Sequence, residues 1–240
     1  MNADATRRSL LQKSLMAGSI LVPAIGVPVI LSAQAGKESE PEVAATEDLM
    51  REHGVIRRAL LVYEECIPRL RQNASSLDPA ALHRTAQLFR SFGEDYHERM
   101  LEEQHIFPVI RKMNQELAHY ADILIAQHTR GREMTDYILA VTGGAKIAAA
   151  HATPLAQVFE GFVRMYENHA AREDTIIFPA WKQNFTNKQL DELSDRFEDI
   201  EHRAFGKDGF EEAEKAISSI EGSLGLSDLS RFTPPSPPIP

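Results

Sequence analysis

The sequence contains a single cysteine, Cys66, in 240 residues. One cysteine cannot form an internal disulfide, and it is too few for a cysteine-based zinc knuckle or an iron–sulfur cluster with all-cysteine ligation. Positive charge is also in deficit, because 26 Lys and Arg stand against 35 Asp and Glu, for a formal net charge of −9. This balance argues against nucleic acid or an anionic membrane as the main partner, since both require clustered positive charge. Histidine, by contrast, is abundant, with nine residues.

Several common catalytic motifs are also missing. We find no glycine-rich phosphate loop, nucleophile elbow or Cys–His pair. The run that starts at His97 falls short of the metalloprotease motif His-Glu-x-x-His, because position 101 is leucine, which cannot bind zinc. Glu-x-x-His occurs at Glu94–His97, Glu102–His105 and Glu116–His119. Ferritin-like carboxylate sites need this motif on two separate bundle helices, and these copies crowd into 26 residues, which argues against ferritin-like chemistry.

The first 35 residues have the layout of a signal peptide. Arg7-Arg8 precedes an uncharged stretch, residues 14–35, which ends in a small-x-small cleavage site at Ala35. The arginine pair resembles a twin-arginine export signal. We therefore expect export to the periplasm, with cleavage after Ala35 and a polar linker over residues 36–45. If the segment is not cleaved, it would act as a membrane anchor.

From Thr46 onward the apolar residues recur with the 3.6-residue period of a helix, and no run alternates like a strand. Long helices are expected over 46–73, 79–114, 116–142 and 154–184, and shorter ones over 187–205 and 209–222, with starts marked at Asp78-Pro79, Thr153-Pro154 and Thr186 with Gln189. This pattern predicts an all-α fold, an antiparallel up-down-up-down four-helix bundle over residues 46–184. Two additional helices form a C-terminal extension over 185–224, and the Pro-rich segment 225–240 is expected to be disordered.

A weak repeat relates the second and fourth long helices. His97 is followed by an acidic pair and Ile-Phe-Pro, and the same elements follow His169. Both acidic pairs lie five and six residues before the proline. In an antiparallel bundle these two helices run in the same direction, so the two motifs can lie at the same depth. The repeat therefore suggests a metal site with approximate two-fold symmetry.

Four histidines occupy comparable positions on the four long helices, and all have apolar neighbours three or four residues away: His53, His97, His128 and His169. A buried imidazole needs a hydrogen-bond partner or a metal. His169 and Glu173 are spaced i, i+4 and project side by side. Imidazole and carboxylate ligands without a thiolate suit iron, manganese or zinc. Four histidines with two bridging glutamates would hold two ions, each with an open position for O₂ or peroxide.

The motifs together resemble the hemerythrin-like HHE cation-binding domain over about Thr46–Lys182. The resemblance is carried by Met50-Arg51-Glu52-His53-Gly54-Val55-Ile56, by Asp95-Tyr96-His97 with Glu102-Glu103 and Phe107-Pro108, by the run from Gln127 to Asp136, and by His169, Glu173 and Phe178-Pro179. It implies a four-helix bundle that holds a non-haem di-iron centre. It also implies that the four histidines are terminal ligands and that Glu173 and a glutamate of the second helix are bridges.

Two departures from the family pattern affect the site. The family usually spaces the histidine and glutamate of the second helix by four, whereas Glu102 follows His97 by five. A one-residue π-bulge would restore the pairing; alignment from the Phe-Pro pair favours Glu102, and Glu98 and Glu103 stay possible substitutes. The second departure is Arg132, which stands where hemerythrins carry a further histidine. A terminal ligand is then missing or supplied elsewhere, which argues against simple reversible O₂ carriage.

The remaining polar and aromatic residues have more ordinary interpretations. His83, His105, His119 and His151 are expected at the surface or at helix ends, although His105 lies close to the predicted bridge. The stretch from Phe197 to His202 is either a solvated acidic face or the source of a further ligand. Tyr63, Tyr96 and Tyr166 are expected in the core with hydroxyls that reach polar partners, and Cys66 is expected to be buried.

The sequence thus predicts an exported non-haem di-iron protein with His53, His97, Glu102, His128, His169 and Glu173 as metal ligands. It would bind or sense O₂, peroxide or NO in the bundle core, with manganese or zinc as alternatives to iron. Two other functions stay open: a di-iron peroxidase or oxidase-like enzyme, and an iron-binding or storage protein without turnover. We expect a small diatomic or peroxide ligand as partner, no nucleic acid, and no membrane beyond the export signal. The oligomeric state stays open.

Overall fold

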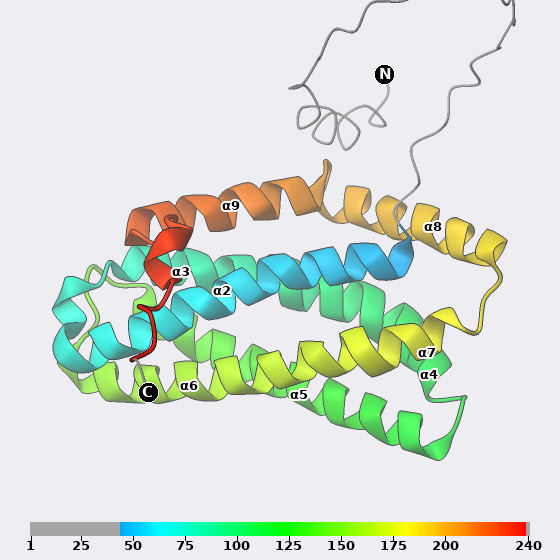
Figure 1. The fold of residues 1–240 in the computed structure, drawn as a ribbon, viewed down its shortest axis with the longest axis horizontal. Coiled ribbons are helices and arrows are strands. Elements are labelled where there is room, and N and C mark those ends of the chain that lie inside the picture. Colours follow the sequence, from blue (N-terminus) through cyan, green and yellow to red (C-terminus); the bar gives the residue numbers. More distant parts are fainter. Residues whose placement is uncertain (1–43, 239–240) are drawn as a thin grey trace, which may run out of the picture. The chain divides into compact units, whose positions relative to one another are not determined.

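The computed structural model describes residues 44–238, and every regular element within this range is helical (Figure 1). The all-α class predicted from the periodicity is therefore confirmed for this range. The predicted signal peptide, residues 1–35, lies outside the described residues. None of the helices between residues 44 and 238 is both long and apolar enough to cross a membrane.

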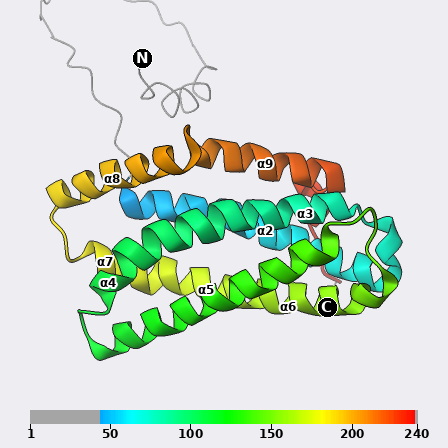
Figure 2. The same cartoon turned by 180° about the vertical axis from the view of Figure 1, so that it is seen from behind.

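Four helical rods form the core of the fold. The first rod is α2 (Ala45–Asn73), which is followed by a short 3₁₀ turn, η3 (Ala74–Ser76). The second rod is the continuous run of α3 (Pro79–Leu88), η4 (Phe89–Ile106) and α4 (Phe107–Ile110), and the third is α5 (Gln115–Thr142). The fourth rod is the continuous run of α6 (Ala149–Arg172), η5 (Glu173–Ile177) and α7 (Phe178–Lys182). Helix α2 packs against α6, and α5 packs against α3, η4 and α6. The four rods therefore lie side by side around a shared core (Figure 1, Figure 2).

Two further helices, α8 (Asn187–Phe205) and α9 (Gly209–Leu224), cover the outside of the first two rods. Helix α9 packs on α2 and α3, and α8 packs on α2 and η4. Both carboxylate oxygens of Glu221 accept hydrogen bonds from Arg58, at 2.9 and 2.6 Å, and so fix α9 to α2. A 3₁₀ turn, η6 (Leu229–Phe232), follows with Asp228 as its cap, so this part of the segment expected to be disordered has a defined turn.

The helix ends differ from the expected ones at two places. The second rod ends at Ile110 rather than at residue 114, because the side chain of Asn114 instead caps α5 by accepting from the N–H of Leu117. The fourth rod begins at Ala149, and Pro154 lies inside α6 rather than at its start. The alanines at its beginning are strong helix formers and extend the helix by a turn before the proline. The predicted start at Thr186 with Gln189 is confirmed as a capping box.

Two segments, η4 and η5, have the wider hydrogen bonding of a π-helix. At the end of each, the phenylalanine of the Phe-Pro pair donates its N–H to the carbonyl five residues earlier, Phe107 to Glu102 and Phe178 to Glu173. The proline that follows cannot donate a backbone hydrogen bond and crowds the carbonyl four residues before it, which favours a widened turn. The π geometry predicted between His97 and Glu102 is therefore present, over a longer stretch than a one-residue bulge.

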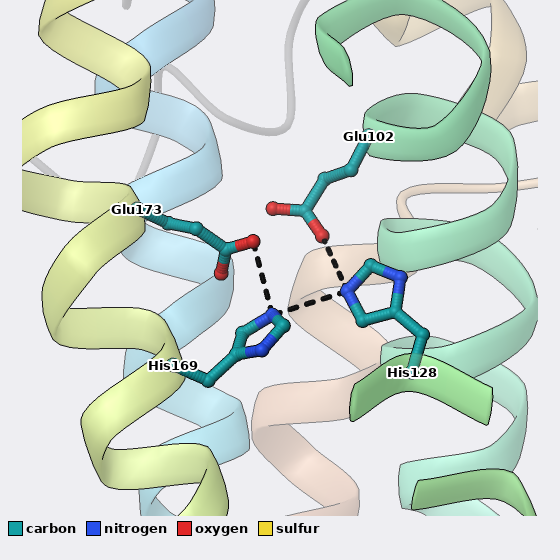
Figure 3. A group of neighbouring side chains, drawn as sticks. All are labelled: Glu102, His128, His169 and Glu173. Carbon is teal, nitrogen blue, oxygen red and sulfur yellow. Dashed lines mark hydrogen bonds and ion pairs between the residues drawn. The ribbon is translucent and has the colours of Figure 1, made fainter. Parts of the chain in front are cut away.

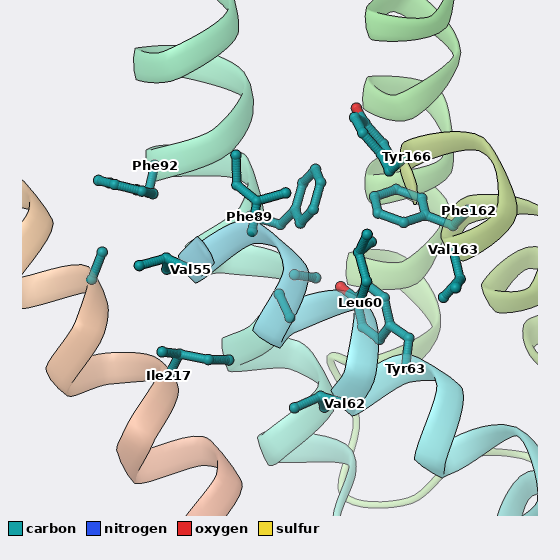
Figure 4. Close-up of a cluster of buried hydrophobic side chains, with 14 of the residues drawn as sticks. Val55, Leu60, Val62, Tyr63, Phe89, Phe92, Phe162, Val163, Tyr166 and Ile217 are labelled. Atoms are coloured by element: carbon teal, nitrogen blue, oxygen red, sulfur yellow. The ribbon is translucent and has the colours of Figure 1, made fainter. Parts of the chain in front are cut away.

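An aromatic cluster fills the core at the level of Tyr63 (Figure 4). The ring of Phe162 packs against Tyr63, Phe89 and Tyr166, with ring centroids 4.7 to 5.5 Å apart. The three tyrosines and Cys66 are buried as predicted. Tyr96 and Tyr166 reach carboxylates, whereas the Tyr63 hydroxyl finds no partner within residues 44–238, so the expected polar contact is wrong for Tyr63.

Candidate metal centre

The six residues predicted as metal ligands lie together in the core between the four rods. They are His53 from α2, His97 and Glu102 from η4, His128 from α5, His169 from α6 and Glu173 from the start of η5. None of the six is more than 3% exposed. Each helix therefore supplies at least one imidazole to a single buried cluster, and the second and fourth rods also supply a carboxylate.

The four imidazoles form two pairs that meet through their Nε2 atoms. Nε2 of His53 lies 3.0 Å from Nε2 of His97, and Nε2 of His128 lies 3.1 Å from Nε2 of His169. Figure 3 shows the second pair with its two glutamates. We call the surroundings of His53 and His97 position 1, and those of His128 and His169 position 2.

The two carboxylates lie between the positions, and each directs one oxygen to each of them. Glu102 Oε1 is 3.3 Å from His97 Nε2, and its Oε2 is 3.4 Å from His128 Nε2. Glu173 Oε1 is 3.0 Å from His169 Nε2, and its Oε2 is 3.5 Å from His53 Nε2. At position 2, two imidazole nitrogens and two carboxylate oxygens all lie within 4.8 Å of one another; at position 1 His53, His97 and Glu102 form such a group, and Glu173 lies near His53.

None of the four oxygens of Glu102 and Glu173 has a hydrogen-bond partner in the described part of the chain. Both side chains are fully buried. A buried carboxylate costs several kcal/mol unless it is paired or coordinates a metal. Bound cations would supply the positive charge that these oxygens lack.

A second set of side chains orients the imidazoles through the outer ring nitrogen, Nδ1. The acceptors are Asp174 for His53 at 2.7 Å, Glu52 for His97 at 2.6 Å, Glu103 for His128 at 2.9 Å and Gln127 for His169 at 2.9 Å. Because these oxygens accept, the ring proton is assigned to Nδ1, and the Nε2 lone pair points into the cluster. All four tautomers therefore suit metal binding through Nε2.

Sequence reasoning did not identify these acceptors, although a signal for them exists. Each acceptor is the immediate neighbour of a predicted ligand, as Glu103 follows Glu102 and Asp174 follows Glu173. Consecutive helical residues point about 100° apart, so the neighbour of an inward ligand faces an adjacent helix. There it meets the histidine of that helix.

Two arginines outside the cluster bind two of these acceptor carboxylates. Arg57 donates to Asp174, and Arg132 donates to Glu103. Arg132 occupies the place where the family pattern has a further histidine, and its charge is paired with this outer carboxylate. It therefore supports the orientation of His128 rather than supplying a metal ligand.

The three glutamates considered on the second helix have different surroundings. Glu102 lies between the two positions, whereas Glu103 accepts from the outer nitrogen of His128. Glu98 Oε1 accepts from the Tyr166 hydroxyl at 2.8 Å, and its Oε2 is 3.9 Å from Nδ1 of His128. Glu102 is thus the carboxylate of this helix that faces the Nε2 atoms.

Neither His105 nor His202 joins the cluster. The His105 ring packs against Phe197, with ring centroids 5.6 Å apart, and Nδ1 of His202 contacts the carbonyl of Glu198 at 3.0 Å. The groups of described residues with metal-binding geometry contain neither histidine.

Burial and mutual charge shift the pKa values of the cluster strongly. Burial raises the pKa of Glu102, but the attraction of His97 and His128 outweighs it and holds this pKa well below its usual range. Burial and the charge of Glu102 raise the pKa of Glu173 well above its usual range. Burial and repulsion by His128 lower the pKa of His169 to about 3. The cluster thus contains an ionised carboxylate, Glu102, beside a carboxyl, Glu173, that favours its protonated form. A divalent cation that binds there would displace the bound protons.

Comparison with known proteins agrees with this geometry. The family described as hemerythrin HHE cation binding domain matches residues 44–181. Proteins of Mycobacterium bovis and Mycobacterium tuberculosis, each described as an uncharacterized protein, are 41% identical over 238 residues, which covers 98% of this chain and 89% of theirs. No solved structure matches the chain significantly. Helices α8 and α9 lie beyond the family match.

Proposed function

Since the chain belongs to the hemerythrin HHE cation-binding domain family, we propose that it is a non-haem di-iron protein that binds or senses O₂, peroxide or NO. The observation that carries this proposal is the arrangement of Glu102 and Glu173. Their four hydrogen-bond-free oxygens face the Nε2 atoms of the four histidines. Manganese or zinc would also suit these ligands. The iron ions would supply the redox chemistry and the binding of the small ligand.

Each position offers at most four protein ligands, fewer than the six of an octahedral ion, so a small molecule could complete the coordination. All six proposed ligands are nearly inaccessible to solvent. This burial favours a diatomic or peroxide ligand over a larger substrate. The rings of Phe178 and Phe107 pack against His53 and His128 at 5.4 and 5.5 Å, where they hold the imidazoles and exclude water.

A turnover enzyme, similar to a peroxidase or oxidase, is a second candidate. It is favoured by the buried residues Glu98, which lies near His128, and Tyr166, whose ring packs against His169 and whose hydroxyl donates to Glu98. Burial raises the pKa of Glu98, so this carboxyl can hold a proton close to position 2. Iron binding or storage without turnover needs neither residue.

Metal content and an ultraviolet–visible spectrum of the purified full chain test the proposal. We expect about two iron ions per chain and absorption bands that respond to O₂, NO or peroxide. His128→Ala should lose iron, whereas His119→Ala, an exposed histidine of the same helix, should retain it. Well under one ion per wild-type chain would contradict the proposal. Steady consumption of peroxide would favour the enzyme.

We also propose that the four rods form an antiparallel up-down-up-down bundle and that residues 1–35 direct export through a twin-arginine signal. Such signals carry folded proteins, which suits a chain that must fold around its metal before it crosses the membrane. Lysine substitution of both Arg7 and Arg8 should retain the protein in the cytoplasm, as cell fractionation would show. Unchanged export of this variant would contradict the twin-arginine assignment.

A further inference from the structure

The metal centre is built from two similar halves, one from α2 and η4 and the other from α5, α6 and η5. The first helix of each half carries Glx-His-x-x-x-Arg, as Glu52-His53 to Arg57 and as Gln127-His128 to Arg132. The second helix of each half carries the repeat of histidine, acidic pair and Phe-Pro. The internal repeat therefore extends beyond the second and fourth rods to all four.

The contacts repeat as well. The His53 Nδ1 contact to Asp174, which is backed by Arg57, corresponds to the His128 contact to Glu103, which is backed by Arg132. The packing of Phe178 on His53 corresponds to that of Phe107 on His128. The bridge Glu173 corresponds to Glu102. Positions 1 and 2 thus have matching ligands and largely matching outer partners.

One pair of outer partners breaks this symmetry. Nδ1 of His97 contacts the carboxylate of Glu52 at 2.6 Å, while the corresponding nitrogen of His169 contacts the side-chain amide oxygen of Gln127 at 2.9 Å. Glu52 is buried and is held in place by the Tyr96 hydroxyl, which donates to its other oxygen at 2.9 Å. The ring at position 1 therefore has a charged acceptor where the ring at position 2 has a neutral one.

This difference acts on the metal through the ring. A hydrogen bond to an ionised acceptor is about twice as strong as one to a neutral acceptor and makes the imidazole more basic at its other nitrogen. A more basic Nε2 binds a cation more tightly, and the buried charge of Glu52 adds to the attraction. Glu102 lies at similar distances from both positions, at 3.3 and 3.4 Å, whereas Glu173 lies 3.0 Å from His169 and 3.5 Å from His53. A preference for position 1 therefore rests on the outer partners and not on these two carboxylates.

From this asymmetry we infer that the two metal positions are unequal, and that a divalent cation fills position 1, at His53 and His97, before position 2. The inference rests on the proposed two-metal function. The ion at position 2 is then the more weakly bound of the two. Position 2 is also the one that lies near Glu98 and Tyr166. Position 1 has no equivalent of Glu98, because Ala170 stands at the corresponding place in α6.

Glu98 is not a charged hydrogen-bond acceptor at position 2 that would make up for the neutral side chain of Gln127. Its Oε2 is 3.9 Å from His128 Nδ1, which is too long for a hydrogen bond, and it lies 3.8 Å from Arg132. The acceptor that His128 uses is Glu103, at 2.9 Å. Glu98 therefore does not change the basicity of the ring as an acceptor does.

Calorimetric titration of the metal-free full chain with Zn²⁺ tests the inference with a redox-inert probe. We expect two binding steps, and Glu52→Gln, which retains an acceptor oxygen but removes its charge, should weaken the tighter step by about 10-fold. Gln127→Glu should strengthen the weaker step and bring the two together. Glu167→Gln, at an exposed glutamate of α6, serves as the control and should leave both steps unchanged. With less than one equivalent of Zn²⁺, anomalous diffraction from crystals should show metal at His53 and His97.

The possible failures are distinguishable. If no variant and no wild-type chain binds Zn²⁺ or iron, the proposed function fails together with this inference. If two ions bind in equal steps that neither Glu52→Gln nor Gln127→Glu alters, or if the first ion lies at His128 and His169, only the order of filling is overturned. Thermal unfolding of each metal-free variant verifies that a weaker step does not reflect loss of the fold.

Discussion

Asp174 in η5 accepts a hydrogen bond from Nδ1 of His53 in α2 at 2.7 Å, across the interior of the protein. Asp174 follows the proposed bridge Glu173 along the chain. One helix turn would therefore bridge the proposed metal ions with one residue, and it orients an imidazole of another helix with the next. Arg57 donates to the second oxygen of Asp174. A hydrogen bond therefore links the proposed ligand His53 of one helix to the neighbour of the proposed ligand Glu173 of another, and loss of this outer acceptor should lower the affinity for metal.

Asp174→Ala tests this link. It leaves every proposed ligand in place but removes the acceptor that fixes the tautomer of His53, so metal affinity should fall by roughly 10- to 100-fold. Asp174→Asn retains an acceptor oxygen and should lose less. Competition with a chromophoric chelator measures the affinity. Asp122→Ala, which removes an exposed partner of Arg111, is the control and should bind metal as the wild type does. Equal affinity of Asp174→Ala and wild type would contradict the link.

Glu173→Gln should make the free energy of unfolding nearly independent of added metal. The wild-type chain should unfold at a higher temperature with metal, by a free energy of about 2.7 kcal/mol when the free metal is at 100 times its dissociation constant. The variant should lose most of this gain. In the metal-free state it should be at least as stable as the wild type, because burial and the charge of Glu102 disfavour an ionised carboxyl at position 173 and raise its pKa, whereas the amide of glutamine is always neutral. Thermal unfolding with and without metal measures both effects.

Glu167→Gln is the matched control, since Glu167 is an exposed glutamate of α6, six residues before Glu173. It should show the full stabilisation by metal. A metal-dependent shift in Glu173→Gln as large as that of the control would rule out Glu173 as a ligand.

The helical class and the clustering of the six residues could be predicted because they depend on periodicity and spacing. Apolar residues at the helical period determine which face of each helix is buried, and His53, His97, His128 and His169 lie on those faces. The five-residue spacing of His97 and Glu102 could be interpreted because the Phe-Pro pair provided a second register. These features are local to one helix.

The features that the sequence did not reveal depend on contacts between helices. The pairing of Glu52 with His97 and of Gln127 with His169 depends on how two helices are rotated about their axes. The start of α6 at Ala149 depends on a balance between alanine propensity and Pro154. The covering of η4 by α8 depends on packing that no motif records.

Gly131 in α5 provides space for a tyrosine of the neighbouring rod. A Cβ atom at this position would lie 1.8 Å from the hydroxyl oxygen of Tyr166. Gly131→Ala should therefore displace Tyr166 from Glu98 and destabilise the protein by about 1–3 kcal/mol, because overpacking outweighs the better helix propensity of alanine. Urea unfolding measures the change.

Gly161→Ala in α6 is the matched control for this substitution. Its Cβ would be 3.6 Å from Met134, an ordinary contact, so alanine should stabilise the helix by roughly 0.5–1 kcal/mol. If both variants shift stability in the same direction, the close approach of Tyr166 does not explain the glycine at position 131.

Glu94 should make stability depend on pH. It is buried in η4, accepts from Thr135 at 2.6 Å, and has a pKa raised to about 7 by burial, although Thr135 and Arg90 favour its charged form. The unfolded carboxyl titrates near 4.5, so the folded protein binds the extra proton between pH 4.5 and about 7. The raised pKa means that stability is highest below this window and falls as the pH rises through it.

Glu94→Gln should remove this loss. Relative to the variant, the wild type should lose up to roughly 3 kcal/mol of unfolding free energy across the window, at 1.36 kcal/mol per pKa unit. Urea unfolding at several pH values between 4.5 and 8 measures both proteins. Asp95→Asn changes a half-exposed neighbour that pairs with Arg99, and its pH profile should follow that of the wild type. If the profiles of Glu94→Gln and wild type are parallel, Glu94 is ionised in the folded protein throughout this range, and its contact with Arg90 then outweighs its burial.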